Sequence, residues 1–118
     1  MQKQMLGGKI HRVTVTEACI DYPGSITIDK KLMDKADILP HEKVLIANLT
    51  NGSRIESYAI PGLAGSGVIC LNGGAAKHGK AGDMVIILTF VVMPDREAKR
   101  HKPRVVYVDS KNHIVKEK

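Results

Sequence analysis

Short segments rich in Val, Ile and Thr, separated by turn residues, recur along the chain and restrict its fold more than any other feature. Segments of this kind are typical of β-strands. No repeat or low-complexity linker interrupts them, and 118 residues suffice for one domain with a buried core. We therefore expect a mainly β fold, a small β-barrel with short helical connections. Strands are predicted at residues 9–16, 25–28, 43–49, 54–60, 68–71, 84–92 and 104–108.

Two helices and one hairpin turn are predicted between these strands. Asp29 can cap a helix over residues 30–36, and a second short helix is predicted over residues 95–100, with Pro94 suited to its first turn. Asn51-Gly52 separates two strands, and this dipeptide commonly supplies the two positive φ angles of a tight hairpin.

The composition excludes several classes of protein. The apolar run 84–93 is about half of the roughly 20 residues that a membrane-spanning helix needs, so we interpret it as a buried strand. The first residues lack the pattern of an export signal, so a cytoplasmic location is expected. Cys19 and Cys70 have no metal-ligand spacing, and we expect two free, structural thiols and no metal.

The formal net charge of +6 leaves a nucleic-acid-binding module open as an alternative function. Much of the positive charge lies in segments 96–104 and 111–118, and the chain has one Phe, three Tyr and no Trp to stack on bases. A solvated basic face is the interpretation we prefer, so no nucleic-acid partner is expected.

Polar residues at alternate strand positions form two candidate pairs. Lys9 and His11 share one face of the first strand, and Arg54 and Tyr58 share one face of another. Taken alone, both pairs are more typical of the solvent faces of two exposed strands than of a functional site.

Three small-residue loops accompany these pairs. Segment 22–25, Tyr-Pro-Gly-Ser, would by itself be a turn, and segment 62–67 lacks the residues of a phosphate loop. In segment 72–76 an Asn precedes four residues with little or no side chain, which leaves room for a small ligand against the backbone. A tight turn is the alternative there.

The order and spacing of these motifs over nearly the whole chain resemble the bacterial aspartate 1-decarboxylase family. The residues that carry the resemblance are Met5-Leu-x-Gly-Lys-x-His-Arg-Val-x-Val-Thr16, Tyr22-x-Gly-Ser25, Asn51-Gly-x-Arg-x-x-x-Tyr-Ala-Ile60, Asn72-Gly, Gly82-Asp-x-Val-Ile-Ile87 and Met93-Pro-Asp95. The resemblance implies a double-psi β-barrel, a homotetramer, and a proenzyme that cuts its own Gly-Ser bond.

For this chain the resemblance implies cleavage between Gly24 and Ser25 into pieces 1–24 and 25–118. Ser25 would become a covalent pyruvoyl group, the cofactor, with no pyridoxal phosphate and no metal. We also expect that residue 24 is glycine because a residue without Cβ tolerates strained backbone angles. The activity implied is decarboxylation of L-aspartate to β-alanine for pantothenate and coenzyme A synthesis, with no membrane partner.

The resemblance also assigns roles to individual residues. Ser25 and Tyr58 would be catalytic, with the Tyr58 hydroxyl as proton donor. The residues assigned to cleavage are Gly24, Ser25, His11, Tyr22 and Ser57. Those assigned to substrate binding are Lys9, Arg54, Ser57, Asn72, Gly73, Gly74 and Ala75.

Two positions depart from the family pattern. Ser57 stands where the family carries Thr, which retains the hydroxyl but loses the methyl group that restricts its rotamer. Gly74 stands where alanine is usual, which loosens the loop. A relative that keeps the fold without the chemistry is a third interpretation, and we rank it last because the whole polar set is present.

Overall fold

The structure, a computed structural model, describes residues 1–116 and is mainly β. Its strands are β1 (Gln2–Thr14), β2 (Glu17–Cys19), β3 (Ser25–Asp29), β4 (Lys43–Asn48), β5 (Arg54–Gly62), β6 (Ile69–Asn72), β7 (Met84–Pro94), β8 (Arg104–Val108) and β9 (Ile114–Val115). Its helices are α1 (Lys30–Ala36), α2 (Asp95–Ala98) and the 3-10 helix η1 (Gly73–Lys77).

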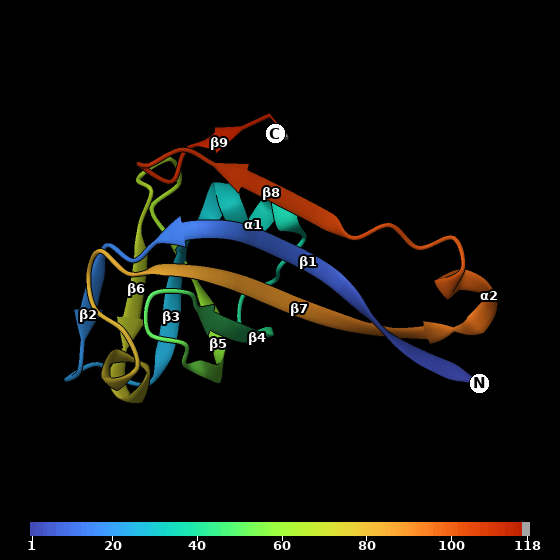
Figure 1. The fold of residues 1–118 in the computed structure, drawn as a ribbon, viewed down its shortest axis with the longest axis horizontal. Coiled ribbons are helices and arrows are strands. Elements are labelled where there is room, and N and C mark those ends of the chain that lie inside the picture. Colours follow the sequence, from blue (N-terminus) through green and yellow to red (C-terminus); the bar gives the residue numbers. More distant parts are fainter. Residues whose placement is uncertain (117–118) are drawn as a thin grey trace.

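The strands form one sheet in the order β2-β6-β3-β5-β4-β7-β1-β8-β9. The sheet curls around an apolar core that α1 covers on one side (Figure 1). Within residues 1–116, backbone pairing does not join β9 to β2, so hydrogen bonds do not close the barrel. The expected fold class, a mainly β chain organised as a small barrel, is confirmed. Fully buried core residues include Ile10, Ile26, Ile28, Leu32, Ile69, Leu71 and Ile87.

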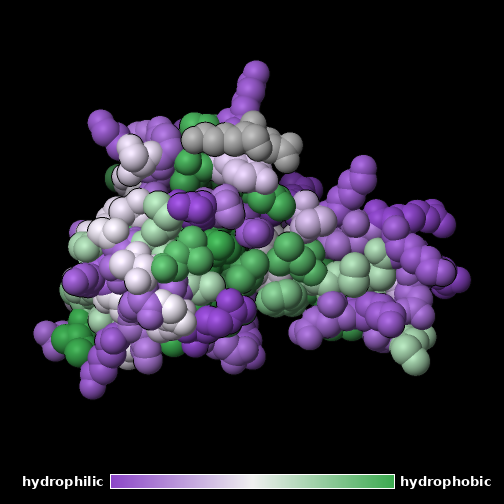
Figure 2. Space-filling view, in the orientation of Figure 1, coloured by the Kyte–Doolittle hydropathy of each residue, from purple (hydrophilic) through white to green (hydrophobic). Residues whose placement is uncertain are grey.

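A two-stranded arm extends from this body, with α2 at its tip (Figure 1). It consists of the first half of β1 and the last half of β7, whose pairing runs from Gln2 opposite Pro94 to Leu6 opposite Phe90. Hydrophilic residues surround the tip, while apolar residues gather in the middle of the face shown in Figure 2. The pairing with β7 explains why β1 begins well before the predicted residue 9.

The other predicted strands end within two residues of β3, β4, β5, β6, β7 and β8. The short strands β2 and β9 were not predicted, because two or three residues carry no readable alternation. The β4–β5 hairpin is confirmed, but its predicted turn is wrong. Gly52 has a φ of 81°, whereas Asn51 does not have a positive φ. The Asn48 carbonyl accepts the Gly52 N–H at 2.9 Å instead, which makes a longer loop.

Both predicted helices are present, although α2 ends at Ala98 rather than at residue 100. None of the helices in the described part of the chain is long and apolar enough to cross a membrane. Asp29 caps α1 as predicted, since its carboxylate accepts the Lys31 N–H at 2.8 Å. The same carboxylate accepts the N–H groups of Gly65 and Gly67 at 2.9 and 2.8 Å, so it also fixes the loop before β6.

Burial alone would raise the pKa of Asp29, but the three backbone N–H donors and the Lys31 charge lower it below its ordinary value. Because the pKa of Asp29 is lower in the folded state than in the unfolded state, its carboxylate stabilises the fold at every pH above the unfolded-state pKa. This contribution is lost as the pH falls through the folded-state pKa. We expect Asp29→Asn, made in the uncut Ser25→Ala chain, to lower the free energy of unfolding by about 1–3 kcal/mol at pH 7. Urea unfolding at pH 7 and below pH 3 checks this, since the difference should shrink in acid. An equal difference at both pH values would contradict it.

Candidate active site

Ser25 is the first residue of β3 and lies opposite Asn72, the last residue of β6. The side-chain amide of Asn72 donates one hydrogen bond to Ser25 Oγ and another to Thr27 Oγ1, both at 2.9 Å. Ser25 and Asn72 are 5% and 4% exposed, so the hydroxyl is held in one place and shielded from water. The strand pairing thus joins two residues that lie far apart in the sequence.

Gly73 packs directly against the loop that precedes Ser25. Its φ is 59°, and a Cβ at this position would lie 2.6 Å from the Tyr22 carbonyl oxygen and 2.7 Å from the Gly24 nitrogen. At Gly73, the space predicted against the bare backbone of segment 72–76 is therefore occupied by the Tyr22–Gly24 loop, which packs against it. Gly74 next to it faces open space, where a Cβ would meet nothing within 4 Å.

The strained backbone that glycine was expected to suit at position 24 is not seen in the structure. The φ of Gly24 lies outside the left-handed region, and a Cβ added there would meet nothing within 4 Å. The steric requirement for a missing side chain falls on Gly73 instead, because that residue closes over the loop from the other side.

Tyr58 lies beside Ser25 across the β3–β5 pairing. The two strands are parallel, and Ile26 lies opposite Ala59. Ser25 and Tyr58 each precede these residues by one position, so they lie opposite one another and point to the same side of the sheet. Arg54 shares that face of β5, about 13 Å before Tyr58 along the strand. Ser57 lies on the opposite face with Ala59, half-buried.

Arg54 begins β5 with an exposed side chain that makes no ion pair among the described residues. The Tyr58 side chain is 38% exposed, and its ring centroid lies 6.3 Å from that of His41. A guanidinium and a phenol on one open strand face leave both groups available to a small ligand.

Lys9 and His11 lie in a second group on β1. The pairing places Lys9 in line with residues of β7, β4 and β5, so three strand spacings, about 14 Å along the sheet, separate Lys9 from β5. His11 stacks edge-on against Tyr107 with ring centroids 5.6 Å apart. Within one chain, Lys9 and His11 therefore lie on a strand that does not pair with β3, the strand that carries Ser25.

The His11 imidazole lines a cavity of about 720 Å³, which is also lined by Arg12, Tyr107 and Asp109. Its Nδ1 is buried without a hydrogen-bond partner among the described residues. Burial first, then the charges of Lys9 and Arg12, lower the pKa of His11. The ring is neutral at neutral pH, so one of its nitrogens can accept a proton.

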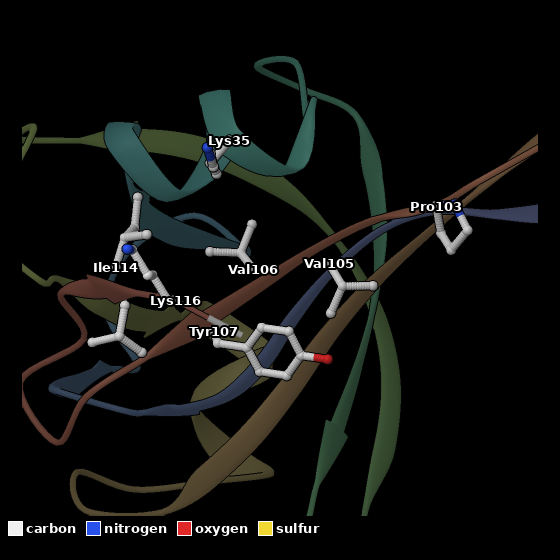
Figure 3. A pocket seen from close by; sticks show the side chains of 8 residues that line it. Lys35, Pro103, Val105, Val106, Tyr107, Ile114 and Lys116 are labelled. Carbon is white, nitrogen blue, oxygen red and sulfur yellow. The ribbon is translucent and has the colours of Figure 1, made fainter. Parts of the chain in front are cut away.

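The other pockets lie elsewhere. A cavity of about 560 Å³ is formed by Lys35 of α1 together with β8, β9 and neighbouring residues (Figure 3). Ser25 does not line any of the five best-formed pockets of residues 1–116. Within residues 1–116, no group of three or more His, Cys, Asp or Glu could hold a metal ion.

The sequence profile of one family, described as aspartate decarboxylase, matches residues 1–115. The chain belongs to the aspartate decarboxylase family. A relative from Listeria monocytogenes named aspartate 1-decarboxylase is 57% identical over 97% of this chain and 90% of its own length. Relatives of the same name from Dehalococcoides mccartyi and Thermoanaerobacter pseudethanolicus are 56% and 54% identical and cover 92% and 98% of their lengths. These matches do not favour the nucleic-acid-binding alternative.

Three residues that contact the candidate site residues were not predicted from the sequence. Thr27 and Cys70 contact Asn72, and Tyr107 packs on His11. The alternation of Ser25 with Thr27, and of Cys70 with Asn72, is the signal that could have placed these four residues on one face. No local pattern indicated Tyr107, because the β1–β8 pairing joins distant segments.

Proposed function

We propose that this chain decarboxylates L-aspartate to β-alanine and carbon dioxide, serving pantothenate and coenzyme A synthesis in the cytoplasm. It would first cut itself between Gly24 and Ser25 into pieces 1–24 and 25–118. The observation that supports this most directly is the Ser25 hydroxyl, buried and held by Asn72 at 2.9 Å next to the bond to be cut. Membership of the aspartate decarboxylase family gives this arrangement its chemical meaning.

The cleavage can be written with the chain's own atoms. Ser25 Oγ attacks the Gly24 carbonyl carbon, the C–N bond breaks, and an ester replaces the amide. Loss of the Ser25 Cα proton then breaks the Cβ–Oγ bond, and Gly24 leaves as a carboxylate. The unsaturated residue 25 takes up one water and releases ammonia, which leaves a pyruvoyl group.

The residues around position 25 suit such a group. The Asn72 amide N–H donates to Ser25 Oγ, the atom that leaves with Gly24, and would remain next to residue 25 as a hydrogen-bond donor after the cut. When present, the pyruvoyl group supplies a ketone that bonds to an amine and accepts electrons as carbon dioxide leaves. No pyridoxal phosphate or metal is required for that role.

Arg54, Lys9 and Tyr58 are the residues we assign to the substrate. The exposed Arg54 guanidinium can bind a carboxylate with two parallel hydrogen bonds. Lys9 would supply charge for the second carboxylate. Tyr58, beside residue 25, would hold a proton on Oη for the carbon that loses carbon dioxide.

We further propose that the working form is a homotetramer. In one chain, three strand spacings, about 14 Å measured along the sheet, separate β1, which carries Lys9 and His11, from β5. Ser25, Tyr58 and Asn72 lie together on neighbouring strands. Contact between two copies would bring the Lys9 and His11 group of one chain to residue 25 of the other.

The intact mass of the denatured protein tests the cleavage, with the Ser25→Ala variant as control. We expect two fragments that meet at Gly24 and Ser25, the larger one lighter by one ammonia than a chain that begins with serine. The Ser25→Ala variant should remain one chain because it lacks the attacking oxygen. A wild-type chain that stays whole after prolonged warming, and releases no carbon dioxide from L-aspartate, would contradict the proposed function.

A further inference from the structure

Cys70 lies behind the contact that holds Ser25. It precedes Asn72 by two positions on β6 and lies opposite Thr27 of β3, so Cys70, Thr27, Asn72 and Ser25 all point to one side of the sheet. Cys70 is 4% exposed. Its Sγ lies 3.2 Å from Asn72 Oδ1.

The hydrogen bonds of the Asn72 side chain are fully accounted for by three neighbours. Both amide protons are donated, one to Ser25 Oγ and one to Thr27 Oγ1. The remaining polar atom, Oδ1, accepts from the Cys70 thiol. A hydroxyl accepts as readily as it donates, so Ser25 and Thr27 alone do not decide which end of the amide faces them.

We propose that Cys70 is a positioning residue for self-cleavage, whose thiol holds Asn72 Oδ1 and so keeps the amide N–H groups directed at Ser25 Oγ. This inference rests on the proposed cleavage and deepens it. In the elimination step Ser25 Oγ departs as a carboxylate oxygen of Gly24, and an N–H donor stabilises the negative charge that develops there. An amide turned the other way would present an acceptor to that charge.

The thiol is in the right state to donate. Burial, followed by the charge of the Glu17 carboxylate and a hydrogen bond with it, raises the pKa of Cys70 to about 11, so the proton remains on sulfur at neutral pH. Glu17 lies opposite Cys70 and is a second acceptor for the same proton, besides Asn72 Oδ1. A disulfide with Cys19 does not compete for this sulfur. Cys19 of β2 lies opposite Asn72 of β6, and Asn72 is two positions beyond Cys70 on that strand. The Cα atoms of Cys19 and Cys70 are therefore about 8 Å apart. A disulfide needs less than about 7 Å.

The test compares self-cleavage rates of freshly purified precursors by intact mass. We expect Cys70→Val, which fills the space without a donor, to slow cleavage by about 3- to 10-fold. Cys70→Ser restores a donor and should cleave at close to the wild-type rate. Cys19→Val removes the other thiol of the same face and should leave the rate unchanged.

Two outcomes would overturn the inference. One is an unchanged rate in Cys70→Val, and the other is a Cys70→Ser variant as slow as Cys70→Val, which would indicate packing alone. Urea unfolding of each variant separates a loss of stability from a loss of rate.

A second measurement does not depend on cleavage. In the uncut Ser25→Ala chain, the infrared S–H stretching band of Cys70 should shift when Asn72→Ala removes its acceptor. An unshifted band would overturn the inference on its own. A wild-type chain that never cleaves itself would instead contradict the proposed function, whatever the infrared band of Cys70 shows.

Discussion

Replacing Gly73 with alanine is expected to slow self-cleavage by about two orders of magnitude, because a displacement near 1 Å at a reacting bond can cost that much. The new Cβ would lie 2.6 Å from the Tyr22 carbonyl oxygen and 2.7 Å from the Gly24 nitrogen, and both are backbone atoms that cannot rotate away. The φ of 59° adds strain for any residue with a side chain. The loop before Ser25 must therefore move.

Gly74→Ala is the matched control. It adds the same methyl group one residue later, at a position where a Cβ meets nothing within 4 Å and φ is not left-handed. The rate of fragment appearance in Gly74→Ala should equal that of the wild type. If Gly73→Ala cleaves as fast as Gly74→Ala, the Gly73 contact does not set the position of the scissile bond.

The two glycines show which parts of the site a sequence can indicate. The small residues of segment 72–76 marked a place where something approaches the backbone closely. The sequence did not reveal that the approaching group is the Tyr22–Gly24 loop, since that depends on the antiparallel pairing of β3 with β6. For the same reason the steric requirement was assigned to Gly24, where the structure leaves open space.

Strand positions were predictable because alternation and turn residues are local properties of the chain. The sheet order is not local, and it decides which polar residues meet. Lys9 and His11 are near the N-terminus and close to Ser25 in sequence, yet β7, β4 and β5 lie between β1 and β3 in the sheet. Tyr58, much further along the chain, is the neighbour of Ser25 because β3 and β5 pair in parallel. The resemblance to the family indicated which polar residues belong to the candidate site. The strand pairing in the structure divides them into two groups, one with Lys9 and His11 and the other with Ser25, Tyr58 and Asn72.

Arg54→Ala is expected to lower kcat/KM for L-aspartate by on the order of 100-fold or more, since losing one partner of a hydrogen-bonded charge pair costs about 2–5 kcal/mol when the pair is buried, as Arg54 would be beneath the bound substrate. Arg54 makes no ion pair among the described residues, so the substitution breaks no bond within the chain. Self-cleavage should persist, because Ser25 is held by Asn72 rather than by Arg54. Carbon dioxide release from fully cleaved protein, with cleavage verified by intact mass, checks both statements.

Two companion variants isolate the chemistry of the guanidinium. Arg54→Lys keeps one positive charge but loses the paired hydrogen bonds, so its kcat/KM should fall between those of Arg54→Ala and the wild type. Arg104→Ala removes the same side chain from the exposed first residue of another strand, β8, and should leave kcat/KM unchanged. An equal loss in Arg54→Ala and Arg104→Ala would mean that total positive charge attracts the substrate. A loss confined to Arg54 would identify a carboxylate-binding residue on the strand face that Tyr58 shares.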